Sequence, residues 1–151
     1  MNLAEAIARQ ARHRSHHTAI VQGDRLVSFG EMQRMVLSVA ARLAAAGARE
    51  GTRVAVSMGT SPEHLAALLA VARIGAVAVA ANPTAGDELR AAIAARYGAA
   101  LLLREPSAKP LPGLDEIVVA PGAPEAAGLP VPAAATGGDA PWRIALSSGT
   151  T

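Results

Sequence analysis

Apolar and polar residues in the first third of the chain predict a helix, a hairpin and a second, longer helix. Asn2 suits the N-cap of a short helix over about residues 3–12. Two short strands are expected over 18–22 and 25–28, joined by a Gly-Asp turn. A small antiparallel hairpin is therefore expected beside the first helix.

A long amphipathic helix should follow the hairpin directly. Ser28 and Glu31 have the spacing of a capping box, in which the two side chains satisfy free backbone N–H groups at a helix start. Apolar side chains then recur on one helical face, at Met32, Val36, Val39 and Leu43. Gly47 stands where a left-handed glycine commonly ends a helix.

From residue 53 onward the pattern changes to alternating strands and helices. Strands are predicted over 54–57, 76–80, 99–103 and 116–119, with helices over about 62–74 and 87–97. Repeated strand–helix–strand units are typical of a parallel sheet covered by helices. The predicted fold class is α/β, a parallel sheet with flanking helices and a small N-terminal hairpin.

The helix that follows the first of these strands has a strong start signal. Ser61 supplies an N-cap, Pro62 the first helical position and Glu63 an acid in the first turn. The side chains predicted to face inward are Leu65, Leu68, Leu69 and Ala72. His64, in the same first turn, is predicted to lie at the surface.

The last part of the chain loses this periodicity. Residues 120–141 are rich in Pro, Gly and Ala, which indicates an extended loop or linker. A short strand over 142–146 then runs straight into Ser-Ser-Gly-Thr-Thr at 147–151. The expected organisation is an α/β core over 1–119, the loop, and a final strand with a hydroxyl-rich segment over 142–151.

Composition narrows the possible function classes. Lys and Arg total 14 against 12 Asp and Glu, and the Arg residues are scattered, which argues against a nucleic-acid interface. The chain has no Cys, which excludes disulfides and thiolate chemistry and suits a cytoplasmic setting. The most apolar stretch, 65–81, has Arg73 in its middle and does not predict a membrane span. His16 and His17 lack a nearby carboxylate or third histidine, so no metal site is predicted.

The segment 147–151 has the chemistry of an anion cradle. Gly149 permits a positive φ angle, and backbone N–H groups and Ser and Thr hydroxyls on either side can converge on phosphate oxygens. Taken alone, the segment also fits a hydroxyl-rich surface turn. The chain has no Walker or GxGxxG spacing. A hydrolase nucleophile at Ser147 would lack the Asp and His that should follow it.

The order of these pieces resembles the start of the adenylate-forming superfamily, which includes acyl-CoA synthetases, luciferases and peptide-synthetase adenylation domains. The segment Val27-Ser-Phe-Gly-Glu31 resembles the family's Thr-Tyr-x-Glu-Leu segment, and Ala81-Asn-Pro-Thr84 is similar to its Leu-Asn-Pro step. Residues 144–151 resemble its Ser-Gly-Thr-Thr-Gly-x-Pro-Lys loop, without the final Gly, Pro and Lys. The resemblance covers nearly the whole chain.

The resemblance implies that residues 1–151 are an incomplete N-terminal AMP-binding domain of an acyl-adenylate-forming ligase. In the family, ATP with Mg²⁺ and a carboxylic acid give an acyl-adenylate and pyrophosphate, and the acyl group then passes to a thiol, often that of coenzyme A. The residues implied to contact the phosphates are Ser147, Ser148, Gly149, Thr150 and Thr151. Catalytic residues are not identified. The chain alone is expected to be inactive, because later family motifs are absent.

Two other interpretations remain open from the sequence. One is a non-catalytic α/β nucleotide-binding module, and the other is a remnant domain that serves only in interactions. Both expect a natural end at Thr151, whereas the enzyme interpretation expects the coding sequence to continue with Gly-x-Pro-Lys. The sequence does not specify the carboxylic acid, the acceptor thiol or the oligomeric state.

Overall fold

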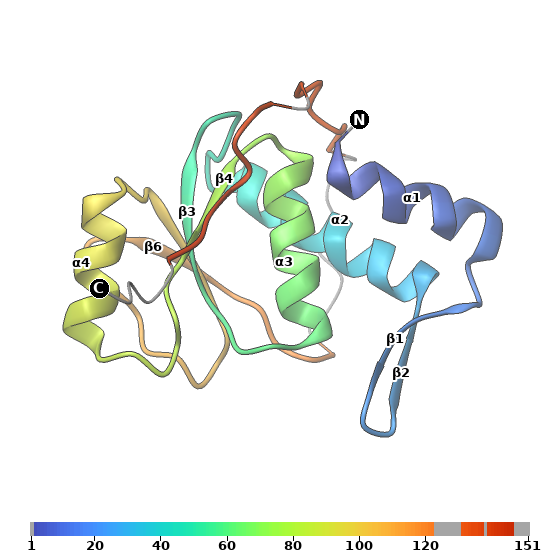
Figure 1. Cartoon of the computed structure of the whole chain (residues 1–151), viewed down its shortest axis with the longest axis horizontal. Coiled ribbons are helices and arrows are strands. Elements are labelled where there is room, and N and C mark those ends of the chain that lie inside the picture. The colour runs from blue at the N-terminus through green and yellow to red at the C-terminus, as the bar shows by residue number, and fades with distance from the viewer. Residues whose placement is uncertain (1, 123–130, 138, 147–151) are drawn as a thin grey trace.

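Helices cover both faces of a parallel sheet (Figure 1). The computed structural model describes residues 2–122, 131–137 and 139–146. The sheet has the strand order β6-β5-β3-β4-β7, and every neighbouring pair is parallel. Its strands are β3 (Arg53–Ser57), β4 (Val77–Ala80), β5 (Leu101–Arg104), β6 (Asp115–Val118) and β7 (Arg143–Ile144). The α/β fold class expected from the sequence is confirmed.

The N-terminal segment forms the predicted helix, hairpin and long helix. These elements are α1 (Leu3–Arg14), β1 (Thr18–Gln22), β2 (Arg25–Ser28) and α2 (Phe29–Ala45). The Glu31 N–H donates to Ser28 Oγ at 3.2 Å, and the Ser28 N–H donates to Glu31 Oε2 at 2.7 Å. The capping box is confirmed. Gly47 has a φ of +85°, as predicted for the end of this helix.

Side chains point alternately to the two faces of the sheet, and a hydrophobic core forms on each face. The predicted inward face of α2 and the side chains of Val54 and Val56 belong to one core, together with α3 (Pro62–Arg73). Ala55 belongs to the other core, under α4 (Asp87–Arg96). Strand alternation thus places α2 and α3 on one face and α4 on the other (Figure 1).

The most apolar stretch of the chain folds into α3, a glycine turn and β4. Within the described residues, no helix is both long and apolar enough to cross a bilayer. Packing of α3 against α1 and α2 as well as the sheet buries Ala66 and Ala67. Leu65 is 40% exposed, because it lies on the part of the first turn that these neighbours do not cover. The prediction that Leu65 faces inward is therefore wrong.

Residues 131–137 contain no helix or strand, yet they are held against the C-terminal end of α3. Arg73 Nε donates to the Val131 carbonyl at 2.7 Å, and the Ala134 N–H donates to the Arg73 carbonyl at 2.7 Å. Asn2, the N-cap of α1, donates through Nδ2 to the Ala72 carbonyl at 2.6 Å. Part of the Pro/Gly/Ala-rich loop is therefore fixed to the helical layer.

Gly75 ends α3 where residues 131–137 cross it. Its φ is +73°, and a Cβ there would lie 3.0 Å from the Cβ of Ala134 and 3.2 Å from Cγ2 of Thr136. Replacing Gly75 with alanine is expected to lower the free energy of unfolding by about 1–2 kcal/mol, through left-handed strain and displacement of the loop. Urea denaturation followed by circular dichroism measures this loss.

The matched control for this prediction is Gly47→Ala. Gly47 is also left-handed, but a Cβ there would meet no atom within 4 Å. Its replacement therefore reports backbone strain alone. Equal losses in the two variants would show that the contact with residues 131–137 contributes nothing to stability.

Candidate functional site

The carboxyl ends of the parallel strands bring several polar loops to one edge of the sheet. β3 ends at Ser57, β4 is followed by the turn 82–84, and β5 is followed by Glu105. β7 runs parallel to β4 and therefore ends at the same edge. In open α/β sheets, ligands bind in the crevice outside these strand ends. This edge is therefore the candidate functional site.

The predicted phosphate contacts lie outside the described residues; they are Ser147, Ser148, Gly149, Thr150 and Thr151. The strand that precedes them is described. β7 pairs with β4 in the register Ala78↔Arg143, and the Ala78 N–H donates to the Trp142 carbonyl at 2.9 Å. Only residues 143–144 form a strand, which is shorter than the predicted 142–146. The described chain thus approaches the predicted segment along the sheet, beside β4.

A cavity of about 320 Å³ lies at this edge, between the ends of β3 and β4 and the first turn of α3. Much of its apolar wall comes from the alanines of β4 and the residue after it, whose short side chains leave space. The polar side chains that line it are Thr60, His64, Asn82, Thr84 and Arg143. The cavity therefore combines an apolar wall with hydroxyl, amide and cationic groups.

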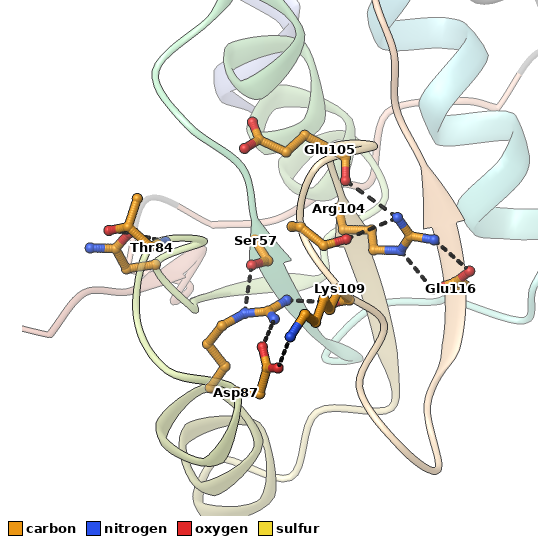
Figure 2. A network of polar contacts seen from close by, with 10 residues as sticks. Ser57, Thr84, Asp87, Arg104, Glu105, Lys109 and Glu116 are labelled. Carbon is orange, nitrogen blue, oxygen red and sulfur yellow. Dashed lines mark hydrogen bonds and ion pairs between the residues drawn. The ribbon is translucent and has the colours of Figure 1, made fainter.

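The turn after β4 is organised by the Asn82 side chain. The Thr84 N–H donates to Asn82 Oδ1 at 3.0 Å, and Thr84 Oγ1 donates to the same oxygen at 2.9 Å. Thr84 lies at the edge of the network in Figure 2. Because Oδ1 accepts both hydrogen bonds, the Asn82 amide N–H groups are the donors that this side chain offers to a ligand.

His64 is half-buried and lines the cavity, so the prediction that it lies at the surface is wrong. Burial and the nearby positive charge of Arg143 lower the pKa of His64, whereas the charge of Glu105 opposes that change. The imidazole is therefore neutral over a wider range of pH than an exposed histidine would be. Sequence reasoning missed this position because Arg143, far along the chain, forms part of the same cavity.

Glu105 fixes the loop between β3 and α3. Its Oε2 accepts a hydrogen bond from the Gly59 N–H at 2.8 Å, and its Oε1 accepts one from Ser107 Oγ at 2.9 Å. The Glu105 N–H donates to the Ser57 carbonyl at 3.2 Å. The carboxylate is therefore engaged in shaping the loop beside the cavity.

Arg90 anchors the α4 side of the same edge, and its side chain is 1% exposed. Its Nε donates to Ser57 Oγ at 3.0 Å, Nη1 to Asp87 Oδ1 at 3.0 Å, and Nη2 to the Lys109 carbonyl at 2.8 Å. Lys109 Nζ also contacts Asp87 Oδ2 at 3.1 Å. Figure 2 shows its partners Ser57, Asp87 and Lys109 close to one another. Sequence analysis did not single out Arg90, and only the acid three residues before it indicated a local ion pair.

The described part of the site suits binding better than covalent chemistry. Across residues 2–122, 131–137 and 139–146, no cluster of three or more His, Cys, Asp or Glu side chains could hold a metal ion. His16 and His17 are exposed, as predicted. What the edge offers is a set of hydrogen-bond donors beside the strand that leads to 147–151.

The family described as AMP-binding enzyme matches residues 7–151. The chain belongs to this family. The match spans the α/β core, β7 and the hydroxyl-rich segment together. The resemblance inferred from the motifs is thereby confirmed.

Curated relatives of this chain include coenzyme A ligases. A 3-hydroxybenzoate–CoA ligase of Aromatoleum sp. (strain CIB) is 47% identical over 64 residues, which is 42% of this chain and 12% of that protein. A feruloyl-CoA synthase of Amycolatopsis sp. is 38% identical over 99 residues, which is 65% of this chain and 20% of that protein. The chain thus spans one fifth or less of the length of these two relatives.

A solved structure supports the fold assignment. An o-succinylbenzoate coenzyme A synthetase from Bacillus subtilis, solved in complex with AMP, has a TM-score of 0.81 at 23% sequence identity. The likeness covers 96% of this chain and 39% of that chain. At this identity the comparison shows that the AMP-binding fold is shared.

Proposed function

We propose that this chain is the N-terminal part of a ligase that converts a carboxylic acid and ATP into an acyl-adenylate and pyrophosphate. The observation that carries the proposal is the position of β7. It pairs parallel with β4, beside the cavity at the carboxyl edge, and ends at Ile144, shortly before the segment 147–151 in the sequence. The family match over residues 7–151 supports the same activity.

The donors at the carboxyl edge fit a bound polyphosphate. Arg143 and the Thr60 and Thr84 side chains line the cavity, and the nearby Glu105 carboxylate is occupied by Gly59 and Ser107. ATP with Mg²⁺, when bound, supplies the electrophilic phosphorus and charge neutralisation. The described residues contain no cluster suited to hold the ion, so its ligands would be nucleotide oxygens and groups elsewhere.

Within the proposed site, residues 147–151 would hold the phosphates through backbone N–H groups and hydroxyls. Ser147, Ser148, Thr150 and Thr151 carry the hydroxyls, and Gly149 allows the backbone to approach closely. Hydrogen-bond donors that point at the departing pyrophosphate stabilise its developing negative charge. Such stabilisation makes a large contribution to lowering the activation free energy of group-transfer reactions. This segment would therefore contribute to catalysis by binding, without forming a covalent bond.

The proposed acceptor of the acyl group is coenzyme A. The names of the relatives, a 3-hydroxybenzoate–CoA ligase and a feruloyl-CoA synthase, support a small carboxylic acid as substrate and a thioester as product. The similarity of Asn82-Pro83-Thr84 to the acyl-CoA synthetase motif favours this acceptor over a carrier protein. Aromatic acids are the first substrates to test.

The proposal is tested by ATP–pyrophosphate exchange. The coding sequence is read past Thr151, its full product is expressed, and exchange is measured against a panel of aromatic and aliphatic acids. We expect acid-dependent exchange by the full product and none by residues 1–151 alone. Exchange by residues 1–151 would overturn the proposed inactivity, and a stop codon after Thr151 with no exchange would favour a binding or remnant domain.

Loss of hydroxyls from the segment 147–151 should selectively impair this exchange. In the full product, Thr150→Ala together with Ser147→Ala is expected to lower the exchange rate at least 100-fold, the loss typical of removing a donor from developing charge. Thr18→Ala is the matched control, because Thr18 is exposed on β1 and does not line the cavity. Equal rates in the two variants would contradict the assignment of this segment.

A further inference from the structure

A guanidinium and an imidazole from distant parts of the chain line one cavity at the carboxyl edge. His64 comes from the first turn of α3, and Arg143 comes from β7. Within the described residues, no carboxylate forms an ion pair with Arg143. Glu105 is the carboxylate whose charge opposes the lowering of the His64 pKa. Its two oxygens already accept hydrogen bonds from the Gly59 N–H and Ser107 Oγ. The exposed guanidinium of Arg143 therefore remains available to pair with an anion in the cavity.

The sheet register explains why Arg143 and His64 share this space. Arg143 pairs with Ala78, and alternation places the Ala78 side chain in the core under α3. Arg143 therefore points to the α3 face of the sheet, where His64 begins its helix. The small side chains of Ala78 and Ala80 leave the space open, because larger residues at these positions would fill it.

The remaining polar groups of the cavity are mainly donors. Thr60 and Thr84 contribute hydroxyls, and Asn82 keeps its amide N–H groups available because its oxygen accepts from Thr84. Donors, a guanidinium and an imidazole that can be protonated are the groups that bind oxyanions. The apolar wall of β4 adds a surface for the body of an organic anion.

We propose that His64 and Arg143 form a binding site for a small oxyanion, a carboxylate or a phosphate group, inside this cavity. This site is separate from the phosphate contacts proposed for residues 147–151, because it is formed by His64, Arg143 and the cavity lining and does not require that segment. An anion bound between the two side chains would neutralise the positive charge of Arg143 and stabilise the protonated form of the His64 imidazole.

Anion binding at this site should be coupled to protonation of His64, which gives the site a measurable signature. Burial and Arg143 lower the pKa of His64 in the empty cavity. A bound anion raises it again, so anion affinity must increase as the pH falls through the pKa of His64. The charged groups near this imidazole are Arg143 from β7 and Glu105 after β5, and Glu105 stays engaged with Gly59.

The experiment is an NMR titration of the 151-residue chain at constant ionic strength. Benzoate represents a carboxylic acid, and sulfate represents phosphate without a pKa between pH 5.5 and 8. We expect benzoate, sulfate or both to shift the His64 imidazole signals and the Gly59 and Thr60 amides, and to raise the pKa of His64. Benzoate alone would assign the site to an acid substrate, and sulfate alone to a nucleotide phosphate.

The chain provides control histidines for the NMR signal of His64 and a control arginine for the charge of Arg143. His13, His16 and His17 are exposed and should not respond. Arg143→Gln should weaken binding at least tenfold, whereas Arg49→Gln should leave it unchanged, because Arg49 is exposed but does not line the cavity. No response of His64 to either anion, or equal affinity in Arg143→Gln, would overturn the site.

A last variant separates this inference from the proposed function. In the chain with Ser147→Ala and Thr150→Ala, the response of His64 should persist, and its loss would show that residues 147–151 carry the binding instead. Adenylation is measured separately, by exchange in the full product. Failure of the ligase proposal and failure of the anion site are therefore distinguishable.

Discussion

Replacing Arg90 with methionine is expected to lower the free energy of unfolding by about 2–4 kcal/mol, because two acceptors lose their donor. The Ser57 side chain is fully buried and accepts from Arg90 Nε at 3.0 Å, and the Lys109 carbonyl accepts from Nη2 at 2.8 Å. Asp87 keeps its contact with Lys109 Nζ at 3.1 Å. The loss therefore comes from unpaired polar groups rather than from an isolated charge.

Arg96→Met is the matched control for this substitution, because Arg96 lies on the same helix and is exposed. It should cost less than about 0.5 kcal/mol. Arg90→Lys should fall between the two, since one ammonium group cannot reach the acceptors that the planar guanidinium spans. Urea denaturation at pH 7 measures all three, and similar losses for Arg90→Met and Arg96→Met would disprove a structural role for this network.

Local sequence patterns were sufficient to predict most of the fold. The capping box of Ser28 and Glu31 predicted the start of α2, and Ser61 with Pro62 predicted the start of α3. Each of these signals depends on groups within one turn of helix. The alternation of strand and helix after residue 53 then predicted the parallel sheet, because the crossovers between parallel strands are usually helices.

Contacts between distant residues were not predictable from those patterns. His64 looked like an exposed first-turn residue, and its burial depends on β7, which follows a segment without periodicity. Arg90 was not singled out from the sequence, because its partner Ser57 lies 33 positions earlier. In both cases the environment is set by the sheet order, which a single sequence specifies poorly.

The environment of Glu63 could not be predicted from the sequence either. The sequence identified it as an acid suited to the first turn of α3, but its side chain is only 4% exposed. Arg25 of β2 binds it through Nη1 to Oε2 at 3.1 Å and Nη2 to Oε1 at 2.5 Å. This bidentate ion pair joins the hairpin to the helical layer.

Arg25→Met is expected to lower the free energy of unfolding by about 2–3 kcal/mol at pH 7, because Glu63 remains buried without its cation. The value lies below the range for fully buried pairs, since the Arg25 side chain is 40% exposed and water can reach the vacated space. Glu63→Gln removes the charge and should cost less. Urea denaturation from pH 7 to pH 4 provides the measurement.

The pH dependence identifies Glu63 as the source of this loss. Burial raises the pKa of Glu63, but hydrogen bonds from Arg25 and a backbone N–H outweigh it, so the pKa lies below the ordinary value of 4.5. In the wild-type chain, the stabilisation from Glu63 is present above that value and is lost as the pH falls through the lower folded-state pKa. In Arg25→Met, burial should outweigh the remaining backbone hydrogen bond and raise the pKa of Glu63, and protonation should then relieve the cost of the buried charge.

The difference in stability between the wild-type chain and Arg25→Met should therefore be largest at pH 7 and shrink toward pH 4. The double variant Arg25→Met with Glu63→Leu is expected to lie close to the wild type at both pH values, because no unpaired charge remains in the interior. A loss in Arg25→Met that stayed constant from pH 7 to pH 4 would show that it arises from lost packing of the hairpin. The ion pair would then serve orientation rather than stability.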